Sequence, residues 1–128
     1  MNGSVIDTNV VIRMLNGDQS AVEMLGKIEK VFVPIIVAGE LFYGAYKSAR
    51  KDDNMALFTS VLSTFEILPV DEPVAVSYAS IKNDLIKKGI KIPENDIWIA
   101  ATAHANGLFL ATFDSHFENI TNIKIIRP

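Results

Sequence analysis

The chain has 128 residues, 49% of them hydrophobic, which predicts one folded domain over residues 1–128 with a substantial core and excludes a disordered chain. No apolar run reaches the roughly 18 residues of a membrane span, and the N-terminus lacks the basic and apolar regions of a signal peptide. The absence of cysteine excludes disulfides and zinc–thiolate sites and fits a cytoplasmic protein, while the net charge of −3, taken alone, argues against a nucleic-acid partner.

Short apolar segments alternate with segments of helical hydrophobic spacing along the chain. We expect strands at residues 4–6, 31–33, 67–70, 108–112 and 122–126. We expect helices at residues 10–15, 18–30, 35–47, 54–65, 71–89 and 93–105. This alternation predicts an α/β fold with three layers, in which helices cover both faces of a mostly parallel sheet of about five short strands.

Two helices carry more specific expectations. Helix 35–47 is apolar nearly all round, so we expect it to be sandwiched between other elements. Gly39 and Gly44 each cost about 1 kcal/mol relative to alanine inside a helix, which indicates close packing or access at that face. Three residues of helix 18–30 are expected to face the core: Val22, Leu25 and Ile28.

Two aspartates follow apolar strands. Asp7 follows the strand at 4–6, and Asp114 lies just past the strand at 108–112. The carboxyl end of a parallel strand is the usual position of ligand chemistry in open α/β sheets. Asp7 equally suits a helix N-cap, because aspartate is among the residues favoured there, so its role stays open at this point.

Two further carboxylates belong to apolar helices. Glu40 lies inside helix 35–47, and Asp96 lies at the head of a helix that begins near Pro93. A buried carboxylate needs a cation or strong hydrogen-bond donors, because desolvation otherwise forces it to take up a proton. An ion pair would satisfy Glu40, but no basic residue lies within the helical turn before it, which favours a functional role.

In a doubly wound sheet these four carboxylates converge on one crevice, where they repel one another unless a divalent cation is present. A ligand set made only of oxygen favours Mg²⁺ or Mn²⁺ over zinc. One ion would leave negative charge at the site and two would neutralise it, so charge does not decide the number of ions. Two basic clusters either complement helix ends or contact phosphates. They are Lys47, Arg50 and Lys51, and Lys87, Lys88 and Lys91.

An acidic site of this kind is typical of phosphate-ester hydrolysis, in which a metal-activated water attacks the phosphorus. Thr112 and Asn9 are placed to orient the carboxylates or the water. His116 lies near the second strand-end aspartate and is a candidate for contact with substrate. His104 is expected at a packed or surface position, and Trp98 is expected in the core.

Four segments resemble the PIN-domain nucleases, and within them the VapC-type toxins of bacterial and archaeal toxin–antitoxin pairs. They are VIDTNVVI around Asp7, VAGELFYGA around Glu40, IPENDIWIAATA around Asp96 and ATFDSHF around Asp114. The resemblance spans essentially the whole chain and implies that these four residues are the catalytic, metal-binding quartet of a Mg²⁺- or Mn²⁺-dependent endoribonuclease. It also implies a homodimer, an RNA substrate, and a cognate antitoxin whose C-terminal segment covers the active site. Thr112 matches a threonine of the family.

Three other classes of protein share parts of this pattern. A receiver-like signalling domain needs an acidic pair after the first strand and a lysine after a late strand, whereas here Asp7 stands alone and Asp114 occupies the late turn. A phosphatase that forms an aspartyl phosphate needs an aspartate where this chain has Asn9. The third alternative is a catalytically silent, PIN-like or receiver-like binding module, against which the complete quartet argues.

Overall fold

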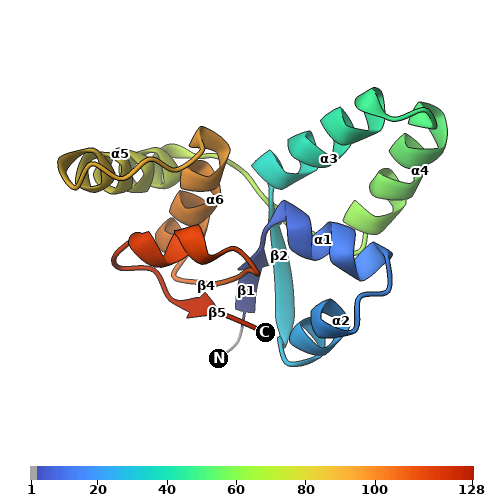
Figure 1. Ribbon diagram of the computed structural model, residues 1–128, viewed down its shortest axis with the longest axis horizontal. Helices are drawn as coiled ribbons and strands as arrows, with labels where there is room; N and C mark the ends of the chain where they lie inside the picture. Colours follow the sequence, from blue (N-terminus) through green and yellow to red (C-terminus); the bar gives the residue numbers. More distant parts are fainter. Residues whose placement is uncertain (1–2) are drawn as a thin grey trace.

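The computed structural model describes residues 3–128, and these form one five-stranded sheet of order β3-β2-β1-β4-β5 (Figure 1). The strands are β1 (Gly3–Ile6), β2 (Lys30–Pro34), β3 (Glu66–Leu68), β4 (Phe109–Ala111) and β5 (Ile125–Ile126). All four pairings are parallel, and Val5 of the central strand stands between Phe32 of β2 and Leu110 of β4. The predicted α/β class, with about five short strands, is confirmed.

Helices connect the strands throughout the described part of the chain. They are α1 (Thr8–Leu15), α2 (Gln19–Gly26), α3 (Ile35–Lys47), α4 (Lys51–Leu62), α5 (Glu72–Lys87), α6 (Glu94–Ala105) and the 3₁₀-helix η1 (Ser115–Asn119). Right-handed crossovers run first toward β3 and later toward β5. As a result, α1 to α4 cover one face of the sheet while α5, α6 and η1 lie on the other (Figure 1). None of the helices within residues 3–128 has the length and hydrophobicity needed to cross a membrane.

The central strand β1 and helix α6 form the middle of the hydrophobic core. Every residue of β1 is buried, and Val5 and Ile6 have no exposed surface. Helix α6 is buried on most sides, and Ile99 and Ala101 are also 0% exposed. Alanines let the α6 backbone approach β1 and β4 closely, and this packing holds the first turn of α6 beside the ends of those strands.

The expectation that helix 35–47 is sandwiched is wrong. One face of α3 packs inward through Val37, Leu41 and Ala45. The opposite face is open to solvent, where Ile35 is 45%, Tyr43 64% and Tyr46 56% exposed. A Cβ added at Gly39 or Gly44 would meet no atom within 4 Å. Access rather than close packing therefore accounts for these two glycines.

Two other helices differ from expectation in detail. Helix α2 ends at Gly26 instead of residue 30, and Val22 is 47% exposed because the helix buries a different face. That face carries Ala21 and Met24. Helix α4 begins at Lys51, before the expected start at residue 54. Two aspartates in its first turn favour this earlier start, because negative charge stabilises a helix N-terminus.

The aromatic pair between α5 and α6 corrects the expectation for Trp98. Its half-buried ring lies at the edge of the core and stacks on Tyr78, with ring centroids 3.8 Å apart. Tyr78 also donates a hydrogen bond to Glu94, whose Oε1 lies 3.0 Å from Lys82 Nζ. His104 is exposed, which agrees with the expectation of a packed or surface position.

Candidate active site

The sheet order places the crevice for a ligand beside β1. The chain leaves β1 toward β2 and later returns on the other side to β4, so the connections separate at the carboxyl ends of β1 and β4. Asp7 follows β1 directly, and Asp114 lies in the turn between β4 and η1. Two of the expected carboxylates therefore occupy the switch point of the sheet.

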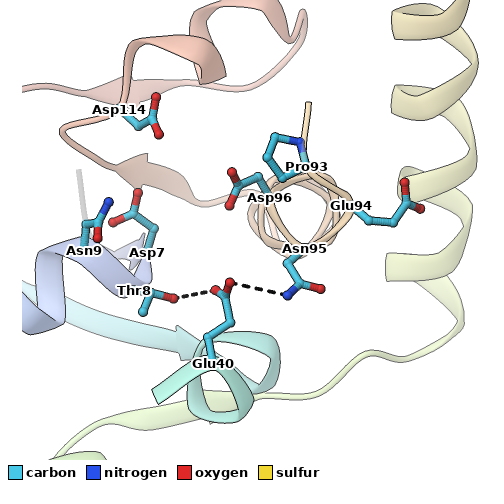
Figure 2. A pocket seen from close by; sticks show the side chains of 9 residues that line it. All are labelled: Asp7, Thr8, Asn9, Glu40, Pro93, Glu94, Asn95, Asp96 and Asp114. Atoms are coloured by element: carbon cyan, nitrogen blue, oxygen red, sulfur yellow. Dashed lines mark hydrogen bonds between the residues drawn. The ribbon is translucent and has the colours of Figure 1, made fainter. Parts of the chain in front are cut away.

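A cavity of about 480 Å³ opens at this switch point and contains all four expected carboxylates (Figure 2). Its lining residues are Asp7, Thr8, Asn9, Glu40, Pro93, Glu94, Asn95, Asp96 and Asp114. Glu40 reaches the cavity from the middle of α3, and Asp96 reaches it from the first turn of α6. Pro93 is the N-cap residue of α6 instead of a member of its first turn. Neither Asn95 nor Asp96 therefore caps the helix, and both side chains are free to face the cavity.

Asp7 is the most deeply buried of the four, at 5% exposed. Its Oδ1 accepts a hydrogen bond from Val10 N at 3.1 Å, so the N-cap interpretation is correct. Its Oδ2 accepts one from Thr112 Oγ1 at 2.5 Å, and Thr112 Oγ1 accepts one from Asp114 N at 3.0 Å. Burial raises the pKa of Asp7, the two hydrogen bonds lower it, and the charges of Asp96 and Asp114 raise it again.

Asp96 is half-buried, and its environment also disfavours the charged form. Burial raises the pKa of this carboxyl above its usual value. The nearby ring of His116 acts in the opposite direction, whereas the charges of Glu40 and Asp114 add to the rise. The charged forms of Asp7 and Asp96 are thus disfavoured for the same reason, because anionic side chains lie close together where water reaches them poorly.

Glu40 is held by neutral donors from two other helices (Figure 2). Thr8 Oγ1 donates to Oε1 at 2.5 Å, and Asn95 Nδ2 donates to Oε2 at 3.4 Å. None of the ion pairs within residues 3–128 includes Glu40, so the alternative of a buried ion pair finds no support. This contact joins the first turns of α1 and α6 to the middle of α3.

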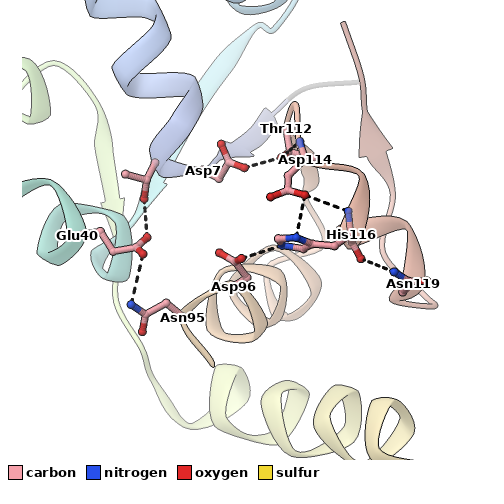
Figure 3. Close-up of polar contacts among 9 residues, drawn as sticks. Asp7, Glu40, Asn95, Asp96, Thr112, Asp114, His116 and Asn119 are labelled. Atoms are coloured by element: carbon pink, nitrogen blue, oxygen red, sulfur yellow. Dashed lines mark hydrogen bonds and ion pairs between the residues drawn. The ribbon is translucent and has the colours of Figure 1, made fainter. Parts of the chain in front are cut away.

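His116 contacts two of the carboxylates at once (Figure 3). Its Nε2 lies 2.8 Å from Asp96 Oδ2, and its Nδ1 lies 2.8 Å from Asp114 Oδ1. The closeness of His116 to Asp114 is visible in the sequence, where the two residues share a turn. The contact with Asp96 is not, because the two side chains come from different elements.

The polar residues around the quartet agree with expectation only in part. Thr112 bonds to Asp7 as its position suggested. Asn9 lines the cavity but is exposed and, among the described residues, donates to none of the four carboxylates. Thr8 and Asn95, which no sequence pattern selected, are the residues that hold Glu40. The sequence signal that could have identified them is that each directly neighbours an aspartate predicted to belong to the site.

The donor set of the cavity fits a hard divalent cation. Carboxylate oxygens dominate it, and a cation would stabilise the charged forms of Asp7 and Asp96, whose pKa values are raised by burial and by the neighbouring carboxylates. Asp96, Asp114 and His116 each have a potential ligand atom within 4.8 Å of the others. The residues present are therefore suited to hold a metal ion.

A parallel α/β sheet with an acidic, oxygen-lined cavity at its switch point is typical of one class of metal-dependent hydrolytic proteins. Within that class, the PIN domain family model matches residues 4–123, and the chain belongs to the PIN domain family. The resemblance seen in the four sequence segments is thus confirmed over nearly the whole chain.

Relatives of this chain are found among ribonucleases and toxin–antitoxin complexes. Ribonuclease VapC2 of Haemophilus influenzae is 37% identical over 125 residues, which cover 94% of this chain and 93% of that protein. The structure of DNA-bound VapBC from Salmonella typhimurium has a TM-score of 0.90 and 28% identity, and covers 99% of this chain and 98% of that one. VapBC2 from Rickettsia felis, bound to a fragment of promoter DNA, has a TM-score of 0.87 and 29% identity over 98% of both chains.

Proposed function

We propose that this chain, a single PIN domain over residues 1–128, is a metal-dependent endoribonuclease and the toxin of a type II toxin–antitoxin pair. The observation that carries the proposal is the convergence of Asp7, Glu40, Asp96 and Asp114 on one cavity. The VapC ribonucleases and VapBC complexes that the chain resembles support the same activity and the same kind of partner.

The four carboxylates act as metal ligands in this proposal, with Mg²⁺ or Mn²⁺ as the ion. A bound divalent ion lowers the pKa of a water and neutralises charge that develops on the scissile phosphate. Asp7 is held from both oxygens, by Val10 N and Thr112 Oγ1, so it enters the reaction in a preset orientation. Glu40 is steadied in the same way from α1 and α6.

The cavity also sets where RNA must lie. Its open mouth admits a phosphodiester beside Asp96 and Asp114, whose side chains are 21% and 34% exposed. Attack by water in line with the leaving oxygen needs no ribose hydroxyl. Recognition of RNA over DNA therefore belongs to the surface around the cavity and not to the quartet.

A groove of about 730 Å³ along α3 supports the proposal of an antitoxin that covers the active site. It shares Thr8, Glu40 and Asn95 with the catalytic cavity, so a partner seated there would also shield the quartet. Its lining includes Ile35, which is 45% exposed, and Gly39, where an added Cβ would meet no atom within 4 Å. We also propose that the chain forms a homodimer and acts in the cytoplasm.

The test of the function is cleavage of a mixed cellular RNA pool by purified, antitoxin-free protein with Mg²⁺ or Mn²⁺. We expect cleavage that disappears with EDTA and in Asp96→Asn. Asparagine keeps the size of the side chain and removes its charge, so the variant should fold. Full activity of folded Asp96→Asn would refute the assignment of the quartet. No cleavage by folded, metal-loaded protein would favour a silent binding module.

A further inference from the structure

His116 bridges carboxylates that belong to separate elements. Asp96 comes from α6, whereas Asp114 comes from the turn after β4, and the ring lies between them with 2.8 Å contacts on both sides (Figure 3). The three side chains are 29%, 21% and 34% exposed for His116, Asp96 and Asp114, respectively. Without the ring, the two carboxylates would face each other as like charges across a partly desolvated gap.

The position of the ring is set by η1. His116 N donates to Asp114 Oδ1 at 3.1 Å, and Asn119 Nδ2 donates to His116 O at 3.1 Å. The imidazole also packs against Phe117, with ring centroids 4.8 Å apart, and Phe117 itself is only 1% exposed. The backbone of His116 is thus tied on both sides, and its ring rests on a core residue.

The contacts leave room for a cation elsewhere on the carboxylates. The ring occupies Oδ2 of Asp96 and Oδ1 of Asp114, so each keeps its second oxygen for a metal ion. Both ring nitrogens are directed at these carboxylates, and His116 is not among the residues that line the cavity. This geometry is that of a residue that contacts the metal ligands without binding the ion and orients them toward it.

We propose that His116 is a positioning residue that holds the carboxylates of Asp96 and Asp114 in the orientation needed for metal binding and is not itself a metal ligand. This inference rests on the proposed function, because it concerns the same quartet. Hydrogen-bond partners of metal ligands typically contribute 10- to 100-fold to metal affinity. The same range is expected for the loss of both ring nitrogens.

The experiment compares metal affinity in the absence of RNA, with Mn²⁺ measured by electron paramagnetic resonance and Mg²⁺ by calorimetry. His116→Phe keeps a ring against Phe117 and removes both nitrogens, whereas His116→Gln keeps one amide that can donate. We expect about 10- to 100-fold weaker binding of both ions in His116→Phe and an intermediate loss in His116→Gln. The matched control is His104→Phe at the far end of α6, which should bind both ions as the unmodified protein does.

Two results would overturn the inference. Unchanged affinity in folded His116→Phe would show that the bridge does not position the carboxylates. A loss confined to Mn²⁺ would identify His116 as a direct ligand, because Mn²⁺ is a transition-metal ion that accepts a nitrogen ligand more readily than the harder Mg²⁺, which takes oxygen ligands. Metal-dependent RNA cleavage by the unmodified protein tests the proposed function separately, so either result with an active enzyme refutes the role of His116 alone.

Discussion

Thr112 shows how one neutral side chain organises the charged ones. Its hydroxyl donates to Asp7 Oδ2 and accepts from Asp114 N, so it joins the ends of β1 and β4. Thr112→Val keeps the shape and removes both bonds. We expect RNA cleavage to fall by about 10- to 100-fold, and the free energy of unfolding to fall by about 1–3 kcal/mol because a buried donor and acceptor lose their partners. Single-turnover cleavage and urea unfolding measure the two effects.

The control for that substitution is Thr102→Val in the same core. Thr102 is also fully buried, but its hydroxyl donates to the backbone oxygen of Trp98 within α6 and touches none of the quartet. Cleavage should stay unchanged in Thr102→Val. If both valine variants lost activity equally, the effect would reflect general loosening of the core and not the bond to Asp7.

Two glycines, one inside a helix and one just after a helix, lead to predictions of opposite sign at the scale of elements. Gly44 lies on the open face of α3, where an added Cβ meets nothing, so Gly44→Ala should stabilise the protein by about 0.5–1 kcal/mol through helix propensity. Gly89 follows α5 with a φ of +70°, so Gly89→Ala should destabilise it by about 1 kcal/mol or more. Urea unfolding compares the two. Destabilisation by Gly44→Ala would mean that this face of α3 is not open.

Sequence patterns predict the existence of the elements better than their surroundings. The helical spacing of residues 35–47 is correct, but the pattern cannot tell a helix between two layers from a helix at the outside of one. The outer face of α3 is exposed because no further element of the described chain covers it. For the same reason, the inward face of α2 depends on how the helix docks and not on which of its residues is most apolar.

At the scale of the whole molecule, the site links metal binding, pH and stability. Burial raises the pKa values of Asp7 and Asp96 above 3.8. The folded, metal-free protein therefore holds these protons more tightly than the unfolded chain. Their contribution to stability is complete below the unfolded pKa and is lost as pH rises through the raised folded values. In the proposed function a divalent ion binds the deprotonated site, so it would restore the stability lost at higher pH.

We therefore expect Mg²⁺ to raise the Tm more at about pH 8 than at about pH 5, relative to EDTA at each pH. At a concentration 100 times the Kd, the stabilisation should approach about 2.7 kcal/mol. Differential scanning calorimetry measures the shift. Asp96→Asn should show a much smaller effect of Mg²⁺, and an equal Tm rise at both pH values in the unmodified protein would contradict this linkage.

The sequence by itself determined the α/β alternation and which four carboxylates line the cavity, because hydrophobic spacing and position at a strand end or helix head are local properties of the chain. Only the tertiary structure decided what holds those carboxylates. Glu40 finds its donors at Thr8 and Asn95, 32 and 55 residues away, and Asp96 meets His116 across 20 residues. Such contacts depend on how helices pack on the sheet, and packing joins segments that no local pattern relates.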